Sequence, residues 1–141
     1  MARTIQQIIE DFDTFAFTSD YMERLRALTD EVRGSGDGHL AMDAMLRVIE
    51  RNPDADCGSP GPLVHTLETF YKKGYEEKLL ESLARKPTEL SVWMLNRLIN
   101  GSKGRTKESY LALLMEIADS SANDGAARES AKRFVKYQAG G

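Results

Sequence analysis

The chain has few of the residues that cross-linked or metal-held folds need. Its 141 residues include one cysteine, Cys57, and two histidines, His39 and His65. A single cysteine cannot form an internal disulfide and is typical of a reducing compartment, so we expect a cytoplasmic protein. Two widely separated histidines and one cysteine do not have zinc-site spacing, and we expect no metal and no cofactor.

Long hydrophobic runs and an excess of positive charge are also missing. The longest uncharged, mostly apolar stretch is Leu90–Asn96, whereas a membrane helix needs about 20 such residues. Acidic residues appear from Glu10 onward, too early for a secretory signal. Nineteen Lys and Arg residues against 22 Asp and Glu residues give a net charge of −3. We therefore expect no membrane and no nucleic acid as partner, although Lys103, Arg105 and Lys107 form a local basic cluster.

The pattern that is present is helical. Apolar residues recur every three to four positions, and no alternating run rich in Val, Ile and Thr predicts a strand. The sequence predicts an all-α fold of about eight helices, with Ser59 and Pro60 starting the fourth, Gly74 ending it and Thr88 capping the sixth. The predicted helices cover about residues 5–15, 21–33, 39–51, 60–73, 75–83, 89–100, 106–117 and 125–135, with Asp124 as a cap of the last.

The helices are short and joined by short turns, which indicates antiparallel hairpins. Val48, Leu83 and Ile117 end the first helix of three successive hairpins, at offsets of roughly 35 residues, as in helical repeats. We predict a HEAT-like right-handed stack, with a globular helical bundle as the alternative. The prediction is one domain over 1–138, in which a glycine-rich turn at 34–38 separates a hairpin at 1–33 from stacked hairpins at 39–138. Residues 139–141 are expected to fray.

Residues suited to catalysis are scarce. Cys57 and His65 are close enough in sequence to form a thiol–imidazole pair, but a small residue in a turn beside an exposed histidine is the commoner arrangement. We expect no enzyme. The sequence does not fix the oligomeric state, and a monomer is the default expectation.

Several residues are candidates for contact with a partner protein. In helical projection Trp93 lies outside the apolar arc of its helix and beside Asn96, Arg97 and Asn100, so this segment is either an interface hot spot or a helix buried on two sides. Glu68 borders an apolar stripe and is either paired with Arg97 or solvated. The remaining candidates are Tyr75, expected to be exposed whereas Phe70 and Tyr71 face inward, and the acidic turn residues Asp54 and Asp56.

Two segments resemble a known family. The first is residues 56–68, with a Gly-x-Pro-Gly-Pro-Leu-Val helix start, and the second is Lys86–Thr88 followed by the Trp-Met-Leu-Asn-Arg helix at residues 92–100. These residues are similar to small helical bacterial immunity proteins encoded beside polymorphic or contact-dependent growth inhibition toxins. The resemblance covers roughly residues 40–117, and residues 1–33 carry no such motif.

The resemblance implies a function without catalysis. An immunity protein binds its cognate toxin domain stoichiometrically in the producing cell's cytoplasm, and such toxins are often nucleases with basic grooves. An acidic inhibitor suits that partner. The alternatives are a helical-repeat adaptor for another cytosolic protein, or a small nucleic-acid-binding protein or enzyme.

Overall fold

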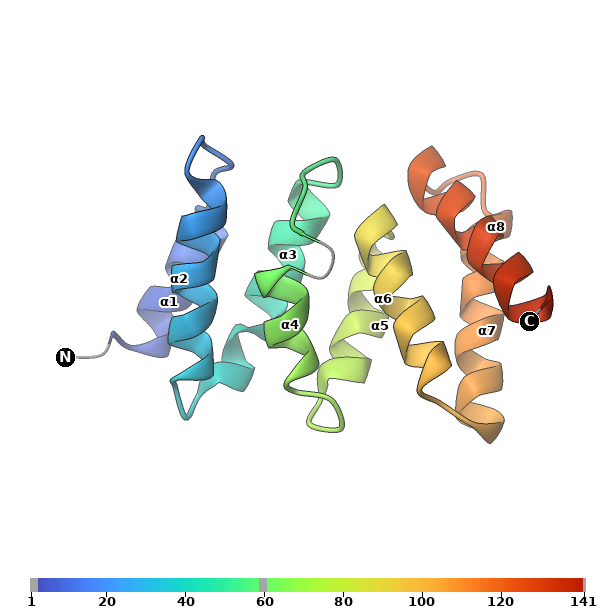
Figure 1. The fold of residues 1–141 in the computed structure, drawn as a ribbon, viewed down its shortest axis with the longest axis horizontal. Helices are drawn as coiled ribbons and strands as arrows, with labels where there is room; N and C mark the ends of the chain where they lie inside the picture. Colours follow the sequence, from blue (N-terminus) through green and yellow to red (C-terminus); the bar gives the residue numbers. More distant parts are fainter. Residues whose placement is uncertain (1–2, 59–60, 141) are drawn as a thin grey trace. The chain divides into compact units, whose positions relative to one another are not determined.

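The computed structural model describes residues 3–58 and 61–140. All regular structure in this part of the chain is helical, which confirms the predicted fold class. The helices, shown in Figure 1, are α1 (Ile5–Asp13), α2 (Tyr21–Arg33), the 3-10 turn η1 (Gly38–Ala41), α3 (Met42–Arg51), α4 (Pro62–Glu68), α5 (Tyr75–Arg85), α6 (Glu89–Asn100), α7 (Gly104–Asp119) and α8 (Gly125–Gly140).

The fourth helix is shorter than the sequence predicts at both ends. It begins at Pro62, with Gly61 as N-cap, and the predicted start at Ser59 and Pro60 lies outside the described residues. It ends at Glu68 instead of reaching Gly74, because the chain turns through Lys72 and Gly74, which have φ angles of 61° and 106°. A left-handed backbone cannot continue a right-handed helix, so α5 starts as a separate element at Tyr75.

The chain forms two compact units, Met1–Lys78 and Leu79–Gly141, and the division falls inside α5. The glycine-rich segment at 34–38 does not divide the chain. Gly38 is buried, and a Cβ placed on it would lie 2.4 Å from the carbonyl oxygen of Val32. That close packing holds the segment against α2 within the first unit. The HEAT-like stacking of all the hairpins stays a prediction.

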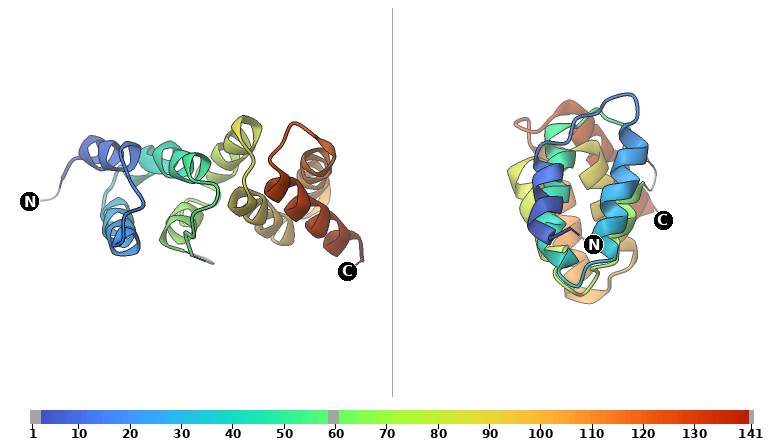
Figure 2. Two further views of the ribbon diagram at one scale, coloured as in Figure 1. Left: turned by 90° about the horizontal axis from the view of Figure 1, so that it is seen from above. Right: turned by 90° about the vertical axis from the view of Figure 1, so that its left-hand side faces the viewer.

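In the first unit the helices form two layers. Helices α1 and α3 pack side by side, and α2 packs against α4 (Figure 2). Apolar side chains from both layers are fully buried between them, among them Phe12, Leu25, Met45 and Leu67. Since α1 and α3 run in the same direction, the loops that follow them, residues 14–20 and 52–58, lie at one end of this unit (Figure 1).

In the second unit α6, α7 and α8 each pack against the other two. Met94, Leu95, Leu114 and Ala131 are completely buried. Helix α8 runs to Gly140, Gly141 lies outside the described residues, and the fraying of residues 139–141 stays a prediction. The Gln138 side chain bonds to two residues of α6, and this contact anchors the last turn of α8.

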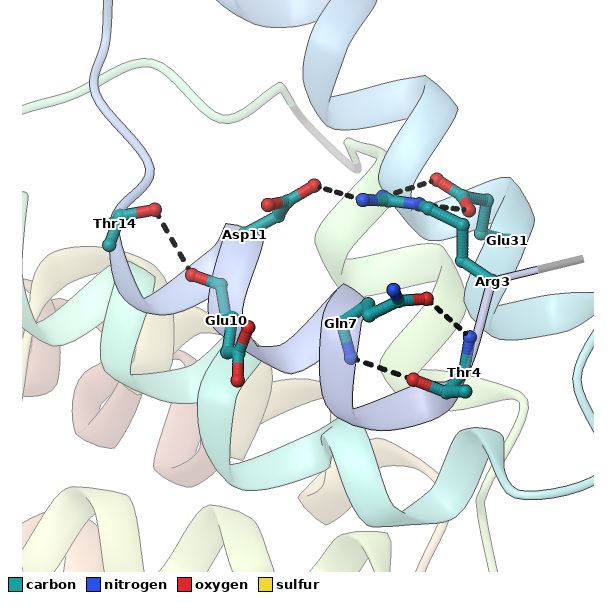
Figure 3. A network of polar contacts seen from close by, with 7 residues as sticks. All are labelled: Arg3, Thr4, Gln7, Glu10, Asp11, Thr14 and Glu31. Atoms are coloured by element: carbon teal, nitrogen blue, oxygen red, sulfur yellow. Dashed lines mark hydrogen bonds and ion pairs between the residues drawn. The ribbon is translucent and has the colours of Figure 1, made fainter.

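An arginine ties the start of the chain to α2. The Arg3 guanidinium donates to both carboxylate oxygens of Glu31, at 3.0 and 2.8 Å, and to Asp11 on α1 at 2.6 Å (Figure 3). A capping box between Thr4 and Gln7 starts α1 beside it. The hydrogen bonds from Arg3 lower the pKa of Glu31 below its ordinary value.

This contact predicts a small stability difference that depends on pH. Because the pKa of Glu31 is lowered in the folded state, ionised Glu31 stabilises the fold above the unfolded carboxyl pKa of about 4.3, and the contribution is lost as pH falls through the lower folded value. Glu31→Gln should therefore lower the Tm by about 1–2 °C at pH 7, a small effect because the pair is partly solvated. Thermal melts of the two proteins should converge at acid pH, and a gap that widened there would contradict this.

Candidate functional site

The acidic turn between α3 and α4 is exposed, as the sequence predicts. Asp54 and Asp56 both face solvent. The hydroxyl of Tyr21, on α2, donates to the backbone carbonyl of Asp56 at 2.9 Å, and the N–H of Gly58 donates to the Asp56 carboxylate at 2.9 Å. The Asp56 backbone and carboxylate are therefore held in place before any partner arrives, which lowers the conformational cost of binding.

The base of this turn is closed by a glycine. A Cβ placed on Gly61 would lie 1.5 Å from the carbonyl oxygen of Cys57. No side chain fits there, because non-bonded atoms do not approach so closely. The Gly-x-Pro-Gly-Pro motif of the sequence thus includes one glycine that lets the two arms of the loop touch.

Cys57 is structural in this arrangement. Its side chain is buried, and burial, followed by the nearby charge of Asp56, raises the pKa of the thiol to about 11. The thiol is protonated at neutral pH and is a poor nucleophile, whereas His65 is exposed. The described geometry gives no support to a Cys57–His65 catalytic pair.

The loop after α1 lies beside the acidic turn, and the sequence analysis did not single it out. It carries an aromatic row in which the Phe17 ring lies 5.2 Å from Phe15 and 5.0 Å from Tyr21. Phe17 is half-buried, and Asp13 and Asp20 are exposed beside it. We call Asp13, Phe17, Asp20, Asp54 and Asp56 the acidic end. Antiparallel hairpins place alternate loops at the same end. This rule could have predicted from the sequence that the loop after α1 lies near the acidic turn.

The sequence left two interpretations of the segment around Trp93, an interface hot spot or a helix buried on two sides. Different residues of the segment fit different interpretations. Asn96 is buried, and the Gln138 amide nitrogen donates to the side-chain oxygens of Asn96 and Asn100, at 2.8 and 2.9 Å. Both asparagines connect α6 to α8, the buried Asn96 as part of the scaffold and Asn100 from an exposed position. Trp93 is half-buried, and the exposed Arg97 places its guanidinium 5.0 Å from the centre of the indole ring. Trp93, Arg97 and Asn100 stay candidates for contact with a partner.

The partial burial of Trp93 predicts a moderate loss of stability on truncation. Trp93→Ala should cost about 1–3 kcal/mol, less than the roughly 2–5 kcal/mol expected for Leu95→Ala, because Leu95 is completely buried on the same helix. Urea unfolding of the two variants checks the order. A larger loss for Trp93→Ala than for Leu95→Ala would contradict the half-buried position.

Two candidate contact residues are not placed as expected. Tyr75 is 1% exposed, so the prediction of an exposed Tyr75 is wrong, and Tyr71 is 42% exposed although it was expected to face inward. Tyr71 is exposed because α4 ends at Glu68 and leaves Tyr71 in the turn that follows. Tyr75 begins α5, as predicted, but its side chain is buried. Glu68 is half-buried at the last residue of α4. Glu68 and Arg97 belong to different units, and their pairing stays a prediction.

The charge of the chain is divided unevenly between the units. Residues 1–78 hold nine Lys and Arg against fifteen Asp and Glu, a net charge of −6, and residues 79–141 hold ten against seven, a net charge of +3. The whole-chain value of −3 hides this division. The acidic end therefore belongs to a unit that is strongly acidic as a whole.

Within residues 3–58 and 61–140, no three His, Cys, Asp or Glu side chains are grouped so that they could hold a metal ion. In the same residues no helix is both long enough and apolar enough to cross a bilayer.

Compared with known proteins, the chain matches no protein-family model, no curated protein and no solved structure.

Proposed function

We propose that this protein is an immunity protein, which neutralises a cognate bacterial toxin domain by stoichiometric binding without catalysis. The observation that carries the proposal is the acidic turn, where Asp54 and Asp56 are exposed on a backbone held by Tyr21 and Gly58. Asp56 is the first residue of the segment 56–68 that resembles immunity proteins. A pair of exposed carboxylates suits the basic groove of a nuclease toxin.

Charge supports the same partner. The first unit has a net charge of −6, which attracts a basic toxin domain over the Debye length of about 8 Å at physiological ionic strength and raises the rate of encounter. The half-buried Phe17 of the acidic end adds an aromatic side chain of a type enriched at the core of protein interfaces. We place the toxin-binding surface at the acidic end in the cytoplasm of the producing cell.

Co-expression tests the proposal. The toxin domain encoded by the neighbouring gene should arrest growth when produced alone, and this protein should restore growth. Asn100→Ala, which alters the α6–α8 contact in the second unit, should also restore growth, because it lies outside the proposed surface. Cell death despite good expression of the folded protein would overturn the proposal, as would the absence of any toxin gene beside this one. That second outcome favours the adaptor alternative.

A further inference from the structure

Helix α8 presents a basic face that the proposed function does not use. Its cations are Arg128, Lys132, Arg133 and Lys136, and its acidic residue is Glu129. The helix therefore carries a net charge of +3, which equals the net charge of the whole second unit.

The cations gather on the solvent side together with an aromatic ring. Lys132, Arg133, Lys136 and Tyr137 are all exposed, and Tyr137 reaches 59%. Lys132 and Lys136, like Arg133 and Tyr137, are four residues apart, so they form two neighbouring rows on one helix face. Arg133, Lys136, Tyr137 and Gly140 line a shallow hollow of about 410 Å³. We call Lys132, Arg133, Lys136 and Tyr137 the basic face.

We propose that the basic face of one molecule binds the acidic end of a second copy of this chain. The two surfaces are complementary in charge. The acidic end holds four carboxylates, of which Asp20 is paired with Arg24 at 3.6 Å, and the basic face holds three cations, of which Lys132 is paired with Glu129 at 3.5 Å. Each surface also includes a partly exposed aromatic side chain, Phe17 on one and Tyr137 on the other. Both surfaces exist on every molecule, so the contact is head-to-tail and can extend to further copies.

A second copy fits the basic face better than a nucleic acid does. A nucleic acid bound there would approach a molecule whose net charge is −3 and whose first unit has a net charge of −6. The acidic end of another copy brings the opposite charge to the basic face. Such a contact is small, and we infer weak association that salt screens.

This association has a consequence that rests on the proposed function. Asp54 belongs both to the acidic end and to the toxin-binding turn. A toxin domain and a second copy therefore compete for the same carboxylate, and addition of the toxin domain disperses the self-associated protein.

Sedimentation velocity tests the self-association directly. The protein should associate at an ionic strength of about 0.01 M, where the Debye length is about 30 Å, and dissociate to monomers at about 0.15 M, where it is about 8 Å. A protein that is monomeric at both ionic strengths would overturn the proposal. Association that does not weaken with salt would overturn it as well.

Paired variants identify the two surfaces. Arg133→Glu/Lys136→Glu removes the basic face, and Asp13→Lys/Asp54→Lys removes much of the acidic end, so each should be monomeric alone at low salt. A mixture of the two should form a dimer and stop there, because each variant supplies one intact surface. Lys103→Glu/Arg105→Glu makes the same charge change at exposed positions at the start of α7 and should associate like the unaltered protein. A monomeric mixture, or a control that no longer associates, contradicts the head-to-tail contact.

Circular dichroism of each variant should show unchanged helix content, because all the altered residues are exposed. Arg133→Glu/Lys136→Glu should still restore growth against the toxin, since it leaves the acidic turn intact. Loss of self-association with retained rescue supports both proposals. Retained self-association in this variant overturns the proposal about the basic face and leaves the immunity function standing.

Discussion

Gly61→Ala is expected to destabilise the first unit by about 3–5 kcal/mol, a large part of the 5–15 kcal/mol that holds a typical domain together. The added Cβ would lie 1.5 Å from the carbonyl oxygen of Cys57 and 2.5 Å from its carbonyl carbon. Both are backbone atoms, so no side-chain rotation relieves the clash. The loop must open, which exposes the buried Cys57 and withdraws the start of α4 from α2.

Gly36→Ala is the matched control. Gly36 also lies in a turn of the first unit, but no atom comes within 4 Å of a Cβ placed there, and alanine restricts the unfolded chain. We expect a change of less than about 0.5 kcal/mol. Chemical denaturation followed by circular dichroism measures both variants. Equal stabilities for Gly61→Ala and Gly36→Ala would show that the two arms of the loop do not touch as described.

Asp54→Lys/Asp56→Lys is expected to abolish toxin neutralisation. If both carboxylates face toxin cations, reversal replaces attraction with repulsion and costs about 2–5 kcal/mol, or roughly 30- to 5,000-fold in Kd. The fold should persist because both side chains are exposed, although Asp56 loses its bond from the Gly58 N–H. Isothermal titration calorimetry with the purified toxin domain measures the change, and stopped-flow mixing should show slower, less salt-dependent association.

Glu108→Lys/Glu116→Lys makes the same change in net charge elsewhere. Both glutamates are exposed on α7, in the second unit. This variant should bind the toxin domain within about twofold of the unaltered protein, because long-range charge contributes less than contact at physiological salt. If both double variants lose affinity equally, net charge and not the acidic turn governs binding.

Periodicity was sufficient to predict most of the fold. Helix α6 was predicted with its structural bounds, Glu89–Asn100, because Thr88 caps one end and a glycine ends the other. The bounds of helix α4 were not predicted correctly, because its start depends on the close approach of Gly61 to Cys57 and its end on the left-handed backbone of Lys72. Neither feature appears in the spacing of apolar residues. The early end of α4 also leaves Tyr71 in an exposed turn, whereas Tyr75 is buried at the predicted start of α5.

The candidate site was predicted in part. Local turn composition was enough to place Asp54 and Asp56 in the exposed turn. Asp13, Phe17 and Asp20 join them only through the packing of α1 against α3 and the bond from Tyr21 to Asp56, which are tertiary contacts. The basic face of α8 was hidden by the whole-chain charge, since six excess negative charges in one unit mask three positive charges in the other.

Titration of toxin activity by this protein tests the central claim most directly. The purified toxin domain, held at a concentration well above the Kd, should lose activity in proportion to added protein and reach full inhibition near one equivalent. The acidic-turn variant Asp54→Lys/Asp56→Lys should not inhibit under the same conditions. Toxin activity that is unchanged by a several-fold excess of folded protein would contradict the account.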